Sequence, residues 1–128
     1  MTGTEWLVDV EGCPADALSD LVRLQSLCGR IIDELHLNVV GQPLWHQFPE
    51  PGGVTGIYLL SESHLTCHTF PEYGTATFNL YCCRPRPEWN WHAELAESIG
   101  AERVHVRRLD RSVTEGVTAV LADVGDSP

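Results

Sequence analysis

The sequence predicts a two-layer fold of the α/β (α+β) class, in which a mainly antiparallel sheet carries two helices on one face. One observation is the order of the segments, which reads strand, helix, four strands, helix, strand, with short connections that favour antiparallel pairing. A second is that residues 75–83 alternate apolar and mixed side chains, so only one sheet face needs a cover. A third is the length of 128 residues, which suits a single domain over residues 1–128 with one modest core.

The first part of the chain is expected to supply two strands and the longer helix. Residues 5–10 are rich in β-forming side chains and predict a short strand. Apolar residues recur every three or four positions from residue 16 to residue 35, which predicts a helix with one apolar stripe. Residues 38–48 predict a second strand at an edge of the sheet, because a glycine and a proline interrupt it.

The rest of the chain is expected to supply the other strands and the shorter helix. Proline and glycine mark most of the boundaries, as they do at turns and at helix ends. The expected elements are a strand at 54–60, a tight connection at 61–64, strands at 65–70 and 75–83, a helix at 89–99, a strand at 103–109 and a weak element at 117–124.

The alternation in the segment 75–83 also indicates which side chains pack against the helices. Ala76, Phe78, Leu80 and Cys82 share one face and are the expected core. The opposite face holds threonine, asparagine, tyrosine and cysteine, a mixed rather than charged set. A mixed face on a small sheet often meets a second sheet, so a homodimer is predicted.

Composition excludes several classes of protein. A formal net charge of −10 argues against a nucleic-acid-binding protein, which needs a basic face for phosphates. No apolar run is long enough to cross a membrane, and the acidic start resembles no secretory signal, so the expected location is the cytoplasm. The odd number of cysteines, five, indicates free thiols in a reducing compartment, and the lack of a C-x-x-C pair argues against a metal site.

The chain contains no lysine, because its eight basic residues, apart from histidine, are all arginine. An enzyme that depends on pyridoxal phosphate holds that cofactor as a Schiff base on lysine. If this protein carries out carbonyl chemistry on an amine, the carbonyl must therefore have another origin.

Residues 61–74 hold the densest cluster of reactive side chains, with two serines, two histidines, two glutamates and a cysteine. A hydrolytic serine–histidine pair is conceivable there, but no G-x-S-x-G motif accompanies it. Two histidines four residues apart could bind a metal ion on a helix, but the segment reads as a strand. On residue types alone, each of these side chains is more often structural than catalytic.

Four short pieces of sequence, taken together, narrow the choice. They are Gly53-Val54-Thr55-Gly56, Glu62-Ser63-His64, the run from His68 to Gly74, and Cys83. In order and spacing they resemble the prokaryotic S-adenosylmethionine decarboxylase family, over about residues 3–108. The resemblance implies the two-layer fold given above and a dimer that packs its sheets face to face.

The resemblance also implies a proenzyme that cuts its own chain. The bond between Glu62 and Ser63 would break, giving fragments 1–62 and 63–128. Ser63 would become a pyruvoyl group, the covalent cofactor that accepts the substrate amine and the electrons left by carbon dioxide. His68 matches the histidine that assists self-cleavage, and Thr55 stands where the family usually has serine.

Other matched positions concern the substrate. Cys83, rather than the adjacent Cys82, matches the cysteine that returns a proton to the substrate carbon. Glu72 matches the carboxylate that holds the ribose hydroxyls. The remaining pocket residues implied by the resemblance are Phe48 as the adenine-stacking ring, Phe70 in place of a tryptophan, and Leu65 as a pocket wall.

Some features depart from the common pattern. Arg84 follows Cys83 where the family has glycine, and the segment Arg84-Pro85-Arg86-Pro87 and three tryptophans (Trp45, Trp89 and Trp91) are unusual. The expected reaction is decarboxylation of S-adenosylmethionine to the aminopropyl donor for spermidine. The alternatives are an arginine or ornithine decarboxylase of the same fold, and a homologue that is never processed.

Overall fold

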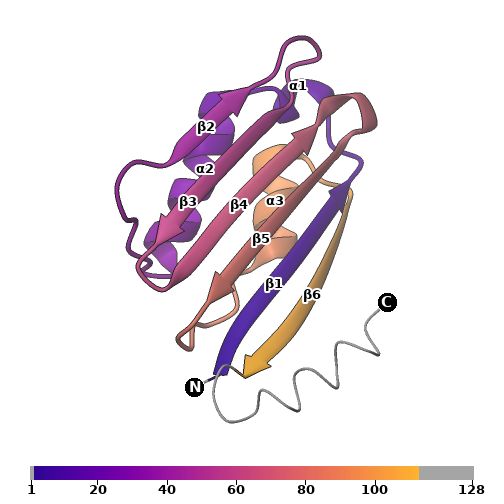
Figure 1. Cartoon of the computed structure of the whole chain (residues 1–128). Coiled ribbons are helices and arrows are strands. Elements are labelled where there is room, and N and C mark those ends of the chain that lie inside the picture. The colour runs from indigo at the N-terminus through magenta and orange to yellow at the C-terminus, as the bar shows by residue number, and fades with distance from the viewer. Residues whose placement is uncertain (1, 113–128) are drawn as a thin grey trace, which may run out of the picture.

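A computed structural model describes residues 2–112 and contains one six-stranded sheet and three α-helices (Figure 1). The strands are β1 (Thr2–Glu11), β2 (Leu44–Gln47), β3 (Val54–Leu60), β4 (Ser63–Phe70), β5 (Thr75–Cys82) and β6 (Arg103–Ser112). The helices are α1 (Ala15–Leu18), α2 (Leu21–Glu34) and α3 (Trp91–Ile99), with a short 3₁₀ turn, η1 (Pro71–Tyr73), between β4 and β5.

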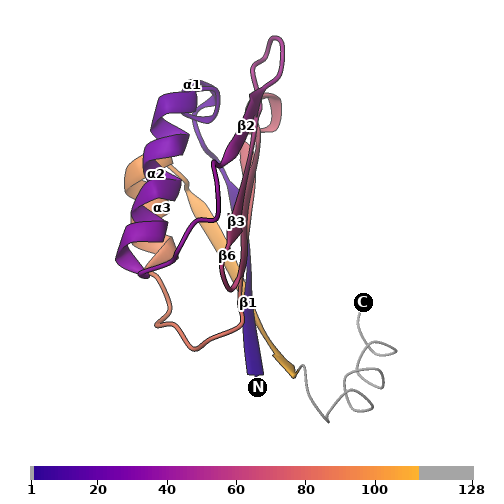
Figure 2. The same ribbon diagram turned by 60° about the vertical axis from the view of Figure 1, so that its left-hand side comes forward.

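The strands pair in the order β2-β3-β4-β5-β1-β6, and every pair is antiparallel. The helices α2 and α3 cover one face of this sheet, while the other face is open (Figure 2). The expected fold class is therefore confirmed. The core between the layers includes Val8, Leu24, Ile31, Phe78 and Leu80, all nearly or fully buried.

The tryptophans that looked unusual in the sequence are structural. Trp89 and Trp91 are buried and pack edge to face against each other, and the Trp89 indole donates a hydrogen bond of 2.8 Å to Glu34 of α2. Trp45 of β2 lies over Gly56, where a Cβ would come within 2.5 Å of its ring. The edge strand can pack this closely only because residue 56 has no side chain.

Two predicted elements in the first part of the chain are shorter than expected. The helix predicted over residues 16–35 breaks after Leu18, and α2 restarts with Asp20 as its N-cap, whose carboxylate accepts from the Arg23 N–H at 3.1 Å. The strand predicted over 38–48 is reduced to Leu44–Gln47, because the backbone at Gly41 has a φ of 71° and leaves the sheet.

Two other strands, β4 and β6, extend beyond their predicted ends. The strand β4 begins at Ser63, so only Ser61 and Glu62 form the turn that was expected to span residues 61–64. The strands β1 and β6 pair along their whole length, which extends the last strand from the predicted residue 109 to Ser112. The weak element expected at 117–124 lies outside the described residues.

The open face of the sheet has a charged half and an apolar half. On the charged half, acidic residues of β1 meet arginines of β6 in cross-strand pairs: Glu5 with Arg111 at 2.8 Å, Asp9 with Arg107 at 3.6 Å and Glu11 with Arg103 at 3.0 Å. The apolar half carries four exposed side chains: Leu44, Ile57, Leu59 and Phe70. Among residues 2–112, no helix is long and apolar enough to span a membrane.

Candidate active site

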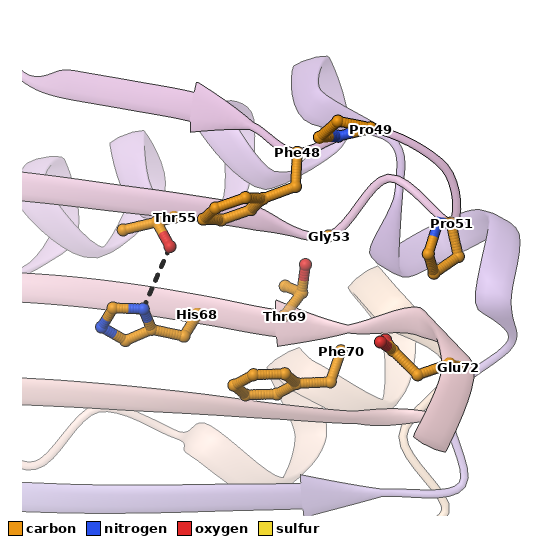
Figure 3. Close-up of a pocket in the computed structure, with 9 residues that line it drawn as sticks. All are labelled: Phe48, Pro49, Pro51, Gly53, Thr55, His68, Thr69, Phe70 and Glu72. Atoms are coloured by element: carbon orange, nitrogen blue, oxygen red, sulfur yellow. Dashed lines mark hydrogen bonds between the residues drawn. The ribbon is translucent and has the colours of Figure 1, made fainter.

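Two hollows lie near opposite ends of strand β4. The first is a cavity of about 360 Å³ between the ends of β3 and β4 (Figure 3). Its lining includes five residues singled out in the sequence: Phe48, Thr55, His68, Phe70 and Glu72. They come from three segments that the β3–β4 pairing and the η1 turn bring together.

Thr55 and His68 are direct cross-strand partners in this first cavity. The Thr55 hydroxyl and the His68 Nδ1 lie 3.1 Å apart and share a hydrogen bond. Both side chains are half-buried. The hydroxyl therefore fixes the orientation of the imidazole and leaves its other nitrogen, Nε2, able to exchange a proton with a ligand.

Both phenylalanine rings lie between the Thr55–His68 pair and the η1 turn, Phe48 near Thr55 and Phe70 near His68, with Glu72 at the turn itself (Figure 3). Phe48 is 51% exposed and Phe70 is 41% exposed, which is unusual for rings of this size. Glu72 is exposed at the mouth of the same cavity. Two open aromatic faces beside a carboxylate suit a flat, partly polar ligand with hydroxyl groups.

The second hollow, of about 710 Å³, lies at the turn between β3 and β4. Three predicted residues line it: Glu62, Ser63 and Cys83. The backbone N–H of Cys83 donates a hydrogen bond of 3.2 Å to the carbonyl oxygen of Glu62. The Ser63 hydroxyl is buried and has no hydrogen-bond partner among the described residues. A hydroxyl without a partner thus lies next to a carbonyl that a neighbouring N–H polarises.

The carboxylate of Glu62 is held from another direction. Arg86 Nη2 lies 3.0 Å from one of its oxygens and 3.3 Å from the other, and Arg84 Nε lies 3.4 Å from the second oxygen. Both arginines belong to the segment that follows β5. Glu62 is therefore fixed at its side chain and at its backbone by residues 83–86.

The two adjacent cysteines differ as the strand alternation predicted. Cys82 faces the core, and burial raises its pKa to about 11, so it stays a protonated thiol. Cys83 is half-buried and lines the second hollow beside Tyr81. Burial and the neighbouring Cys83 thiol raise the pKa of Tyr81.

Leu65 is the one predicted pocket residue that the structure places elsewhere. It is fully buried in the core and lines neither hollow. The reason is the alternation of side chains along β4. Leu65 points to the same face of the sheet as its pairing partners Tyr58 and Leu80, which belong to the core. The expectation that it forms a pocket wall is wrong for this structure.

The remaining predicted residues fall into two groups that do not meet within one chain. Ser63 and His68 are five residues apart on the same extended strand, which places their Cα atoms about 16 Å apart at the usual rise per residue. The group around Thr55 and His68 therefore cannot touch the Glu62–Ser63 bond of its own protomer.

A polar network beside the second hollow was not predicted from the sequence. His64 Nε2 lies 2.8 Å from Asn79 Oδ1, and Asn79 Nδ2 donates a 2.9 Å hydrogen bond to Glu5. Since a carboxylate only accepts, Asn79 must turn its oxygen toward His64, and Nε2 of His64 carries the proton. The alternation along residues 77–81 indicates that Asn79 faces away from the core. It does not reveal the partner, because Glu5 on β1 is far away in the sequence.

Comparisons with known proteins identify a family for this chain. The model of the S-adenosylmethionine decarboxylase family matches residues 4–112. An S-adenosylmethionine decarboxylase proenzyme of Moorella thermoacetica is 32% identical over 114 residues, covering 88% of this chain and 90% of that protein. A proenzyme of the same name from Saccharolobus solfataricus is 34% identical over 101 residues, covering 78% of this chain and 79% of that protein. The crystal structure of the adenosylmethionine decarboxylase from Aquifex aeolicus superimposes with a TM-score of 0.74 at 27% identity, covering 88% of this chain and 92% of that chain.

Proposed function

The chain belongs to the S-adenosylmethionine decarboxylase family, and from this premise we propose that it is a self-cleaving proenzyme that matures into a pyruvoyl-dependent S-adenosylmethionine decarboxylase. The reaction is that of a carboxy-lyase and yields the aminopropyl donor for spermidine. One observation carries the proposal. The buried Ser63 hydroxyl has no partner among residues 2–112, and the carbonyl before it accepts the N–H of Cys83.

Self-cleavage starts with attack of the Ser63 oxygen on the Glu62 carbonyl carbon. The carbon–nitrogen bond breaks, the serine amine takes up the proton, and an ester replaces the amide. Loss of the α-proton of Ser63 then expels Glu62 as a carboxylate and leaves dehydroalanine. Its imine tautomer takes up one water and releases ammonia, which leaves a pyruvoyl group at the start of fragment 63–128.

The Cys83 N–H supports the first of these steps. Negative charge builds on the Glu62 oxygen when the carbonyl is attacked, and the N–H already lies 3.2 Å from that oxygen. A donor that is fixed in place before the reaction stabilises such charge without reorganising. Because this donor belongs to the backbone, it is present whatever side chain stands at position 83.

The mature site would use both groups of residues. The pyruvoyl group, once formed, supplies the carbonyl that takes up the electrons left by carbon dioxide. Cys83 lines the hollow beside this position and is the proposed proton donor to the substrate carbon. Phe48 and Phe70 are proposed to face the adenine and the sulfonium, and Glu72 to accept from the ribose hydroxyls.

Two chains are needed to bring these groups together. His68 would take the α-proton of Ser63, yet it lies about 16 Å away along its own strand. In a homodimer with open faces packed together, the first cavity of one protomer can lie over the second hollow of the other. The exposed Leu44, Ile57 and Leu59 give this face the apolar area that such an interface requires.

Co-expression of two inactive variants tests the shared site. His68→Ala alone should cleave slowly, and Ser63→Ala alone should not cleave. In a mixed dimer, the His68→Ala chain keeps Ser63 and receives His68 from its partner, so its cleavage should recover. Mass spectrometry of differently tagged chains measures this. Unchanged slow cleavage of the His68→Ala chain, with mixed dimers present, would contradict a site shared between protomers.

The substrate is tested by release of labelled carbon dioxide from S-adenosylmethionine, arginine and ornithine in turn. We expect release from S-adenosylmethionine. Phe48→Ala should raise KM about 5- to 150-fold, because base–aromatic stacking contributes about 1–3 kcal/mol. Phe48 is half exposed, so this change should leave the fold intact. The matched control is Val22→Ala, which shortens an exposed apolar side chain of α2 that lines neither hollow and should leave KM unchanged. Release from arginine or ornithine alone would overturn the proposed substrate but would not contradict the proposed self-cleavage.

We also propose a cytoplasmic location. The five cysteines are all free thiols, as expected in a reducing compartment.

A further inference from the structure

Resting on the proposed function, we propose that Arg86, assisted by Arg84, is a positioning residue for self-cleavage. Its guanidinium holds the Glu62 carboxylate and so presents the Glu62 carbonyl to the Ser63 hydroxyl. The same pair of arginines then retains Glu62 as the new C-terminus of the first fragment. Neither arginine touches the reacting atoms, and both act through the Glu62 carboxylate.

The contact between Arg86 and Glu62 is unusually enclosed for a turn residue. Glu62 is in a two-residue hairpin turn, where a carboxylate normally extends into water. Here its side chain is only 18% exposed, and that of Arg86 is equally enclosed at 18%. The guanidinium is also anchored by a 3.0 Å hydrogen bond from Nη1 to the Pro85 carbonyl. An enclosed pair with both partners fixed is worth more than an exposed ion pair.

The segment that carries the arginines is itself stiff. Pro85 and Pro87 flank Arg86, and proline fixes the backbone φ near −65°. A stiff segment loses little conformational freedom when it orders, so it can hold a side chain at low entropic cost. Arg84 is 72% exposed and makes the longer contact of 3.4 Å, which suits an assisting role.

Glu62 is held at two points by one short stretch of chain. The Cys83 N–H binds its carbonyl at 3.2 Å, and Arg86 binds its carboxylate three residues further on. Two contacts on either side of the Glu62 Cα restrict rotation of the residue in a way that one contact would not. The carbonyl is therefore kept in a fixed direction relative to the buried Ser63 hydroxyl, which is the condition for intramolecular attack.

The local charges also change in the favourable direction during the reaction. Before cleavage, one carboxylate of Glu62 faces two guanidinium groups, so the cluster has one excess positive charge. Elimination of the ester creates a second carboxylate on Glu62, which balances that excess. The arginines therefore favour departure of Glu62 as well as its positioning.

Conversion of the intact chain into fragments, followed over time on denaturing gels, tests this role. Arg86→Gln should slow cleavage at least tenfold, and Arg86→Lys should recover part of the rate because it restores the charge. Glu62→Gln should also slow cleavage, and the double variant should be no slower than the slower single variant. The matched control is Arg23→Gln, which removes an exposed ion pair with Asp20 on the helix side of the sheet and should leave the rate unchanged.

The outcomes separate this proposal from the one on which it rests. An intact wild-type chain contradicts self-cleavage itself, and the positioning role with it. Wild-type cleavage together with an equal rate in folded Arg86→Gln, or additive effects in the double variant, overturns only the role of Arg86. If Arg86→Gln does not fold, the cleavage rates of Arg84→Gln and Glu62→Gln test the proposal instead. Slower cleavage supports it, and wild-type rates in both variants overturn it.

Discussion

Replacing Ser63 by alanine should leave the protein as one 128-residue chain with no decarboxylase activity. In the proposed mechanism, the hydroxyl supplies both the nucleophile that breaks the Glu62–Ser63 bond and the oxygen through which Glu62 departs. Without it no ester forms, and no pyruvoyl group can follow. The expected loss is complete, because the proposed pyruvoyl group derives from this residue alone. Denaturing gels and carbon dioxide release measure the two effects.

Ser61→Ala is the matched control for this change. Ser61 belongs to the same turn and has the same side chain, but it is exposed and precedes Glu62. It should cleave at the wild-type rate and retain activity. Cleavage of Ser63→Ala at the same bond would rule out the serine mechanism.

Replacing Cys83 by alanine should separate self-cleavage from decarboxylation. Cleavage should continue, since the N–H that holds the Glu62 carbonyl belongs to the backbone and is unchanged. Turnover should fall about 10²- to 10⁴-fold, the usual contribution of a positioned proton donor. Gels follow the first effect, and steady-state carbon dioxide release from the processed enzyme follows the second.

Cys82→Ala controls for the loss of a neighbouring thiol. Cys82 is buried in the core, so its removal should lower the melting temperature and leave turnover close to wild type where the protein is folded. Normal turnover in Cys83→Ala would show that the proton comes from another group.

The strands that the sequence predicted best are those in which alternation and turn residues agree. Residues 54–60 and 75–82 are bounded by glycine, proline or a short turn, and each shows a regular in–out pattern. The break between α1 and α2 was missed, because the apolar spacing continues across it while Asp20 caps a new helix. Periodicity detects the buried face and does not reveal a local backbone break.

The sequence pointed to candidate residues for the site but not to their arrangement. The resemblance pointed to Thr55 and His68, and the structure joins them by a hydrogen bond. Their distance from Ser63 depends on strand register, which short motifs do not reveal. The contact between Glu62 and Arg86 joins residues 24 apart in the chain, and no local pattern marks it.

The most direct test of self-cleavage is the mass of the purified wild-type protein under denaturing conditions. We expect two chains, one ending at Glu62 and one of residues 63–128 whose first residue has the mass of pyruvoyl and no free amine. A single chain of 14.2 kDa, or a second fragment that begins with an unmodified serine, would contradict this expectation.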